Sequence, residues 1–443
     1  MKSARAKKSG SSQKLQEIVR HNRRSGKVGV YSVCSAHPWV IEAAVQQAIE
    51  DDSVLCVEST SSQVNQEGGY TGQAPQAFAD FIHSTARKAG LNMDKVVLGG
   101  DHLGPYPWRN QPASVAMEKA AKLVHDCVLA GYQKIHLDAS MSCADDGQNP
   151  LDPRIVAQRA AALAEVAESA FVELPSGSSA PVYVIGTEVP IPGGETVEGA
   201  APAVTTNDHV RQTLEDFHSA FAERKLSSAW KRVIGLVVQP GVEFGDDVVF
   251  PYDRKKARRL SSALPKDLSV VYEAHSTDYQ SGKALHELVE DHFAILKVGP
   301  WLTFAYREAI FALSAIEREL LNGSKGKRAS QVREALDQAM LRKPEHWKSY
   351  YRGDEAKLRL SRAFSYSDRC RYYWPEPEVQ KEVARLLANL ENQLLPATLI
   401  SQYLPMEYEA YQDGLIPAYT RQLVRHHVQA VMKVYAAACG FNR

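Results

Sequence analysis

The sequence predicts an α/β protein whose core is a ring of eight parallel strands, each followed by a helix. Between residues 29 and 300, short β-branched runs alternate with longer segments rich in Ala, Glu and Leu. Most of the eight runs are continuously apolar, which is typical of parallel strands covered on both faces. The segments after these runs are long and polar, whereas those leading back to the next run are mostly short. This asymmetry favours a barrel whose strand-to-helix loops build a site.

The strands are expected at residues 29–34, 54–60, 96–101, 134–139, 182–188, 233–239, 269–275 and 294–298. Helices are expected at 37–48, 74–89, 113–130 and 152–169, where apolar residues recur at three- and four-residue spacing, and 303–321 is expected to close the ring. Eight strands favour a closed (β/α)₈ or TIM barrel, with an open doubly wound sheet as the alternative.

Three regions follow from this assignment. Residues 1–26 form a basic tail and a leading helix, 27–321 the (β/α)₈ barrel, and 322–443 a C-terminal helical extension. The extension contains an aromatic and basic stretch at 365–375, SYSDRCRYYWP. We expect the extension to pack on the barrel, with a helical lid or an oligomer surface as alternative roles for it.

Composition excludes several classes of protein. Lys plus Arg and Asp plus Glu both number 52, so no charge excess indicates nucleic acid or a membrane surface as a partner. No apolar run approaches the roughly 18 residues of a membrane span. No apolar stretch follows the basic start, and none of the six cysteines forms a C-x-x-C pair. We therefore expect a cytoplasmic protein with reduced cysteines.

Polar side chains stand at the ends of the predicted strands, where a barrel places its catalytic groups. The first set comprises Glu58, Asp101, His102, Asp138 and His275. Imidazole is a common ligand of zinc and neighbouring divalent metals, and a nearby carboxylate can move a hydroxyl proton. The alternative for each is structural, as a helix-capping Asp or a hydrogen-bonded strand-end His.

Two further residues end the fifth and sixth strands, Glu188 and Gln239. A carboxylate after a run as apolar as VYVIG needs a metal, a proton partner or a basic residue, because a buried unpaired charge costs several kcal/mol. The seventh strand also carries Glu273 and Asp278 in YEAHSTD.

Candidate substrate and phosphate groups follow the seventh and eighth strands and occur in the extension. They are Ser276, Thr277, Lys297, Gly299, Arg369 and Arg371. Barrels often hold phosphate in the loops after strands seven and eight, at helix N-termini. A Schiff-base role is the alternative for Lys297. The sequence contains no G-x-x-x-x-G-K-[ST], G-x-S-x-G or H-E-x-x-H motif.

Long segments of the chain resemble the GatZ/KbaZ family, described as the accessory subunit of class II tagatose-1,6-bisphosphate aldolase. They include VESTSSQVNQEGGYTG, LGGDHLGP, KIHLDASMSCADD, IGTEVPIPGGE, VYEAHSTDYQ and HFAILKVGPWLTFAYREAIFAL. The resemblance implies the barrel independently of the strand count. It also implies a place in carbohydrate catabolism and a distant relation to the catalytic class II aldolases.

The resemblance assigns roles to several site residues. Asp101 and His102 match the Asp and first metal-binding His of the aldolases, and His275 matches the last His. Gln239 stands where the middle His is expected, and Glu188 matches the glutamate of a Gly-rich loop. A divalent metal is implied, with Zn²⁺ expected first and Mn²⁺, Co²⁺ or Ni²⁺ as alternatives.

Two functions follow from the resemblance. The chain is a metal-dependent epimerase that interconverts tagatose 6-phosphate and fructose 6-phosphate by a retro-aldol route, or it is a non-catalytic partner of a class II aldolase chain. The retained set of polar strand-end residues favours the enzyme, since a structural subunit has no need to bury them. The expected partners are a small sugar phosphate and, for the second function, the aldolase chain. A homo-oligomer is compatible with both functions.

Overall fold

The strands close into a barrel, as the sequence predicts. The computed structural model describes residues 11–147, 150–189, 201–322, 327–391 and 393–441. All eight barrel strands are parallel, in the order β1-β10-β9-β6-β5-β4-β3-β2, and each overlaps an expected range. They are β1 (Val30–Val33), β2 (Leu55–Thr60), β3 (Val96–Leu103), β4 (Lys134–Leu137), β5 (Val182–Ile185), β6 (Val233–Val237), β9 (Val271–Ala274) and β10 (Ile295–Val298).

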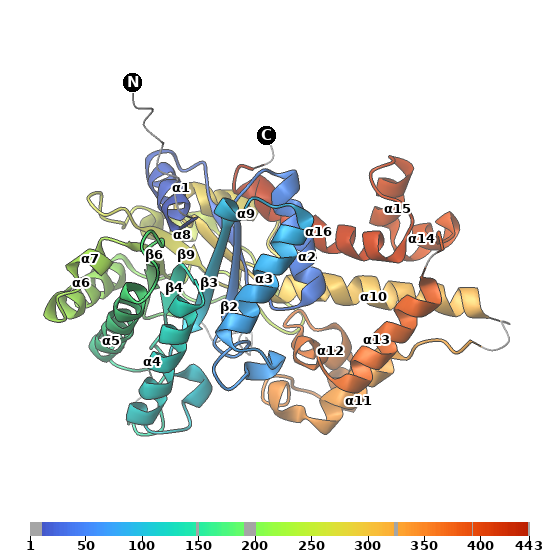
Figure 1. Cartoon of the computed structure of the whole chain (residues 1–443), viewed down its shortest axis with the longest axis horizontal. Coiled ribbons are helices and arrows are strands. Elements are labelled where there is room, and N and C mark those ends of the chain that lie inside the picture. The colour runs from blue at the N-terminus through green and yellow to red at the C-terminus, as the bar shows by residue number, and fades with distance from the viewer. Residues whose placement is uncertain (1–10, 148–149, 190–200, 323–326, 392, 442–443) are drawn as a thin grey trace.

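Helices surround the barrel between the strands (Figure 1). They are α2 (Pro38–Glu50), α3 (Pro75–Ala89), α4 (Ala113–Leu129), α5 (Pro153–Val172), α6 (Asn207–Glu223), α7 (Ser227–Trp230), α8 (Arg254–Ser261), α9 (Gly282–Glu290) and α10 (Pro300–Leu321). In α5 the buried residues include Val156, Ala160, Ala164 and Ala167, the three- and four-residue spacing of a helix with one face against a sheet. Asp152 caps this helix by accepting the N–H of Arg154.

Helix α1 (Ser11–Ser25) closes the end of the barrel where the strands begin. Its Leu15 and Val19 join the apolar cluster inside the barrel, together with Val30 and Val97. Arg23 donates to the carbonyl oxygen of Pro265, in the turn before β9 (2.8 Å). A site can therefore open only at the opposite end, where the strands finish.

The C-terminal region contains α11 (Val332–Arg342), α12 (Glu355–Phe364), α13 (Pro377–Leu390), α14 (Ala397–Tyr403), α15 (Pro405–Gln412) and α16 (Thr420–Ala438). Helix α16 packs against α2, α9 and α10. Its Tyr435 hydroxyl donates to the Thr277 carbonyl oxygen (2.7 Å), and the following Cys439 carbonyl accepts the Gly29 N–H (3.2 Å). The last helix of the chain thus covers β1 within the ring of helices, while α11 and α13 contact α10, and α12 packs on α11 (Figure 1).

One loop differs from its expected form. The segment after β6, expected only to be a long polar loop, contains a short antiparallel pair, β7 (Glu243–Phe244) and β8 (Val249–Phe250). All six cysteines are free. Among the described residues, no helix has the length and apolarity to cross a membrane.

Candidate active site and metal centre

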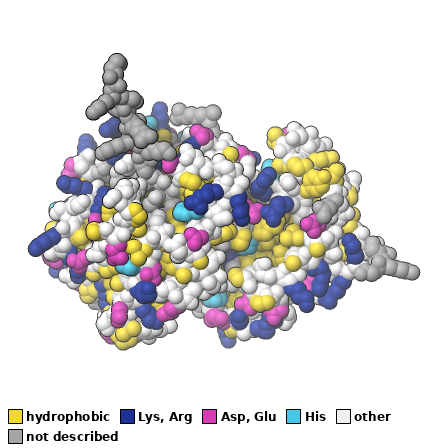
Figure 2. All heavy atoms as spheres, viewed as in Figure 1, with side chains coloured by type: hydrophobic (Ala, Val, Ile, Leu, Met, Phe, Trp, Pro, Cys, Tyr) yellow, Lys and Arg dark blue, Asp and Glu magenta, His cyan; other side chains and the backbone are white. Residues whose placement is uncertain are grey.

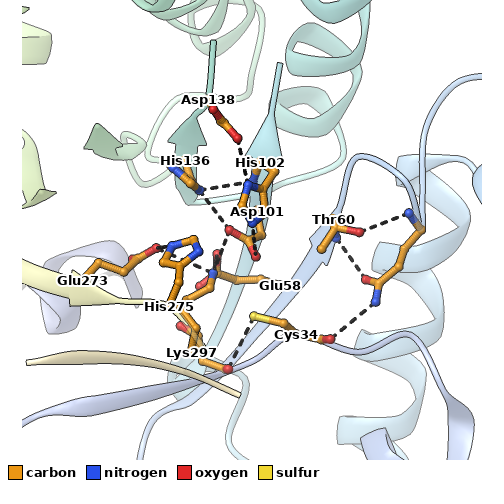
Figure 3. A network of polar contacts seen from close by, with 12 residues as sticks. Cys34, Glu58, Thr60, Asp101, His102, His136, Asp138, Glu273, His275 and Lys297 are labelled. Atoms are coloured by element: carbon orange, nitrogen blue, oxygen red, sulfur yellow. Dashed lines mark hydrogen bonds and ion pairs between the residues drawn. The ribbon is translucent and has the colours of Figure 1, made fainter. Parts of the chain in front are cut away.

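Charged side chains from five strands, β2, β3, β4, β9 and β10, meet inside the barrel (Figure 3). Alternate residues of a strand face the same side, so Lys134 and His136 on β4 both point inward, as do Glu273 on β9 and the following His275. The site forms two layers. The deeper layer consists of carboxylates and ammonium groups, and the layer above it is built on histidines.

The deeper layer consists of Glu58, Lys134, Glu273 and Lys297, all buried. Lys134 Nζ lies 2.8 Å from Glu58 Oε1 and 2.7 Å from Glu273 Oε2. Lys297 Nζ lies 2.7 Å from the other Glu58 oxygen. Gly99 makes room for this layer, because a Cβ there would approach Glu58 Cγ to 2.8 Å.

The ionic contacts keep these groups charged despite their burial. Burial alone would lower the pKa of Lys134, but Glu273 and Glu58 outweigh it and raise that pKa. Burial alone would raise the pKa of Glu273, but Lys134 and Lys297 outweigh it and hold the pKa well below its ordinary value. The layer is thus a closed ionic network at the base of the site.

Three histidine rings form a nearly equilateral triangle above this layer. The ring centroids of His102, His136 and His275 lie 5.1–5.3 Å apart. Asp101 lies beside them, with Oδ1 2.9 Å from His136 Nδ1 and 3.0 Å from Lys297 Nζ. His102 Nδ1 lies 2.8 Å from Asp138 Oδ2.

A distortion of β3 lets adjacent residues share the site. His102 has a φ of 50°, and the pairing of β3 with β4 shifts register between Gly100 and Leu103. In a regular strand, Asp101 and His102 would face opposite sides. The left-handed residue turns the His102 ring inward, so that it lies 5.1 Å from the ring of His275.

Electrostatics set the charge states of the upper layer. Burial would raise the pKa of Asp101, but His102 and Lys297 hold it well below its ordinary value. Burial would lower the pKa of His102, yet Asp101 and Asp138 keep it raised. Burial lowers the pKa of His275 to about 4, so this imidazole is neutral near pH 7 and available as a ligand.

The donor set fits a divalent cation. Single ligand atoms of Asp101, His136, Glu273 and His275 all lie within 4.8 Å of one another. His136 Nε2 is buried without a hydrogen-bond partner, a state that a bound cation would relieve. The four buried carboxylates of the two layers outnumber the two ammonium groups, so a divalent charge would balance the site when the imidazoles are neutral. Mixed imidazole and carboxylate ligation suits Zn²⁺ and its neighbours.

A pocket of about 630 Å³, including its open mouth, leads to this cluster. Asp101, His102 and His275 line its base, and Arg371 and Tyr372 line it from the C-terminal region. These two residues belong to the short helix η5 (Arg369–Tyr373), within the aromatic stretch noted in the sequence. The stretch therefore contributes directly to the pocket wall.

Most predicted site residues lie together. Glu58, Asp101, His102, Asp138, His275 and Lys297 form the cluster, and Ser276, Gly299 and Arg371 line the pocket. Thr277 instead donates to the Lys297 carbonyl (2.6 Å) and Arg369 to the His346 carbonyl (3.1 Å), and neither lines the pocket.

Glu188 and Gln239 occupy a separate position at the rim. The Thr205 hydroxyl donates to Glu188, and the Gln239 N–H donates to the same hydroxyl (2.8 Å). The Gln239 amide oxygen accepts the N–H groups of Gly241 and Val242 (2.8 and 3.1 Å) and thereby shapes its own loop. The third imidazole comes from β4 rather than β6. Residues 190–200, the Gly-rich loop after β5, lie outside the described residues.

His136 and Lys134 were not singled out from the sequence. The signal was present as a two-residue period, since Lys134, His136 and Asp138 alternate with Ile135 and Leu137 in KIHLD. A strand with polar residues at every second position, inside an otherwise apolar barrel, has its polar face toward the centre.

Comparison with known proteins assigns the family. Residues 15–440 match the model of the D-tagatose-1,6-bisphosphate aldolase subunit GatZ/KbaZ-like family. The chain belongs to the GatZ/KbaZ-like family. A solved structure described as a probable tagatose 6 phosphate kinase from Sinorhizobium meliloti 1021 is 43% identical to this GatZ/KbaZ-like chain, with a TM-score of 0.84. The match covers 93% of this chain and 100% of that one.

The YdjI aldolase from Escherichia coli K12 is a more distant match to the GatZ/KbaZ-like chain. It is 12% identical with a TM-score of 0.42, over 84% of this chain and 95% of the aldolase. The fructuronate-tagaturonate epimerase UxaE from Cohnella laeviribosi is 11% identical with a TM-score of 0.43, over 94% of this chain and 82% of the epimerase.

Proposed function

We propose that this protein is a metal-dependent ketose-phosphate 4-epimerase that interconverts D-tagatose 6-phosphate and D-fructose 6-phosphate. The observation that carries the proposal is the convergence of three imidazoles and Asp101 over a closed ionic layer, at the base of an open pocket. Such a concentration of buried ionisable groups in a cleft is typical of a catalytic site. The names of the family and of the 43% identical relative both include tagatose phosphates, which supports the choice of sugar.

Inversion at C4 requires bond cleavage, because C4–H is not adjacent to the carbonyl at C2. In the proposed route Asp101 takes the proton from the O4 hydroxyl, the C3–C4 bond breaks, and C4 becomes an aldehyde. The electron pair of that bond moves onto C3 and the C2 carbonyl. After the aldehyde rotates, C3 attacks its opposite face, and the proton returns from Asp101 to O4. No redox partner is needed.

The residues of the cluster divide these tasks. We assign cation binding to Asp101, His136, Glu273 and His275, with Zn²⁺ expected first. A divalent cation, when bound, supplies positive charge that stabilises the electron pair left on the sugar. The contact of His102 with Asp138 fixes that ring beside the reacting atoms. Lys134 and Lys297 hold Glu273 and Asp101 as ionised carboxylates.

The test is turnover by the purified chain alone. We would measure its metal content and incubate it with fructose 6-phosphate, with and without EDTA, resolving products by NMR. Formation of tagatose 6-phosphate that EDTA abolishes and added metal restores supports the proposal. A metal-free preparation that yields no product after reconstitution with Zn²⁺, Mn²⁺, Co²⁺ or Ni²⁺ contradicts it.

A second function, that of a stabilising subunit for a class II aldolase chain, is favoured by one surface. Large apolar side chains are exposed around α14 and α15, where they gather in Figure 2. They are Leu394, Met406, Tyr411, Leu415 and Tyr419, exposed by 38–70%. Exposed apolar patches mark protein contacts. Co-expression with an aldolase chain, followed by co-purification and aldolase assay, tests this role, and Leu415→Lys should weaken the complex while leaving epimerase turnover unchanged.

A further inference from the structure

The loops after β9 and β10 form the part of a barrel that commonly binds phosphate, through N–H groups at the start of the following helix. In this chain that helix is α10, and its first N–H groups are already engaged. The Gly299 and Trp301 N–H groups both donate to Asp278 Oδ1, at 3.0 and 2.8 Å. Pro300 has no N–H, and the Leu302 N–H donates to the Gly299 carbonyl. No backbone donor at this helix terminus is left for a phosphate.

The neighbouring side-chain donors are also committed. Lys297 Nζ contacts the carboxylates of Glu58 and Asp101 at the base of the pocket. The Thr277 hydroxyl donates to the Lys297 carbonyl oxygen (2.6 Å). Lys297 and Thr277, both predicted from the sequence to bind phosphate, are thus already engaged by contacts within the protein.

Asp278 also adds negative charge to this side of the pocket. Its side chain lines the pocket wall together with Gly299 and Ser276 and is 3% exposed. Burial raises its pKa to about 6, so the carboxylate is ionised at pH 7 and above. The flanking residues Ser276 and Tyr279 have φ angles of 52° and 62°, so the loop adopts a strained path to bring Asp278 to the start of α10.

We infer that Asp278 is a specificity-determining residue, which excludes phosphate from the β9 and β10 loops and accepts a sugar hydroxyl there. The inference rests on the proposed function and narrows its substrate to ketoses whose end at these loops is unphosphorylated. Arg371, a cation of the pocket wall, forms no salt bridge with a carboxylate among the described residues, and its guanidinium donates to the carbonyl oxygens of Ser367 and Asp368. It is the group assigned to the phosphate of the sugar. A ketose 6-phosphate fits this pocket, and a 1,6-bisphosphate does not.

Inorganic phosphate tests the inference without requiring turnover. The amide signals of Gly299 and Trp301 would be followed by NMR during a phosphate titration of the full-length protein. In the wild type they should not respond, whereas Asp278→Gly should bind phosphate at these amides with a Kd of about 1 mM or below. Asp278→Asn is the matched control, because its amide oxygen still accepts both N–H groups, and it should gain little. Wild-type amides that respond at about 1 mM phosphate, or a folded Asp278→Gly variant that gains no binding, would overturn the inference.

Substrate selectivity gives a second readout if Asp278→Gly does not fold. The wild type should use a ketose 6-phosphate at least about 100-fold better in kcat/KM than the 1,6-bisphosphate, as epimerase or as aldolase. Comparable kcat/KM values for the two sugars would overturn the inference while leaving a catalytic role intact. If the epimerase assay alone fails, the proposed function is contradicted. The role of Asp278 is then still tested by the phosphate titration.

Discussion

The two halves of the barrel interior differ in kind. On the side of β2, β3, β4, β9 and β10, the inward residues toward the strand ends are ionic, and Glu58, Lys134 and Lys297 are buried with partners within 3 Å. Only the first inward residues of these strands, such as Val97, Val271 and Ile295, belong to the apolar interior cluster. On the side of β5 and β6, Val182, Val184 and Val237 belong to the apolar interior cluster. Polar groups return on that side only at the rim, with Glu188 and Gln239.

This difference between the two sides of the barrel indicates where the catalytic groups lie. A buried carboxylate next to an ammonium group stays ionised and fixed, whereas Glu188 has a side chain 38% exposed and a hydroxyl partner. Preorganised charge in a desolvated site has far more effect on a reaction than charge in contact with water. We therefore assign the reacting groups to the ionic half, and the following experiments test that assignment.

The largest expected effect is on catalysis. Asp101→Asn should lower kcat by about 10³-fold, since it removes the proton acceptor while keeping the side-chain shape. His275→Ala should lower both kcat and the metal content, measured by plasma emission spectroscopy. Asp101→Asn should lower the metal content less, because its amide oxygen can still bind the cation. If either variant retained wild-type turnover and metal, the ionic half would not be the catalytic half.

The next effect is on stability. Lys134→Met should lower the free energy of unfolding by about 3–5 kcal/mol, because Glu58 and Glu273 would lose the ammonium group between them. Urea unfolding measures this, with the exposed Lys122→Met as control, for which a change under about 0.5 kcal/mol is expected. Equal effects at both positions would mean that the ionic layer does not hold the barrel together.

An ion pair outside the barrel shows whether such pairing is special to the site. Glu407 on α15 accepts hydrogen bonds from His426 and His427 on α16. Burial alone would lower the pKa of His427, but its contacts with Glu308 and Glu407 raise that pKa to about 9. Its ordinary value is 6.5. The stabilisation is thus complete below pH 6.5 and should be lost as the pH rises through 9, by about 3 kcal/mol.

Glu407→Gln should remove a large part of this pH dependence, with the remainder due to Glu308, as measured by unfolding between pH 7 and 10. Glu409→Gln, on the same helix but exposed, should retain it. A wild-type stability that stays flat through pH 9 would show that the ion pair contributes little.

The smallest effects are expected at the rim. Glu188→Gln and Gln239→Ala should each change kcat/KM by a factor of about three or less, since neither side chain lines the pocket. Their metal content should equal that of the wild type. A loss at Glu188→Gln comparable to that at Asp101→Asn would instead assign the proton transfer to Glu188.

The sequence alone determined the barrel and much of the site. Eight apolar runs followed by polar loops define parallel strands with a site at their ends, because strands that are covered on both faces are mostly apolar. Asp101, His102, Asp138 and His275 were recognisable for the same reason, as polar groups placed directly after such runs.

Only the tertiary structure decided which of these residues meet. Closure of the barrel brings the ring of His136 to within 5.2 and 5.3 Å of the rings of His102 and His275, and the turned backbone at His102 brings adjacent residues to one face. The tertiary structure also pairs Lys297 with the buried carboxylates and lets Asp278 accept the N–H groups at the start of α10. These pairings join residues far apart in the chain, and because a contact depends on closure of the barrel, no local sequence pattern encodes it.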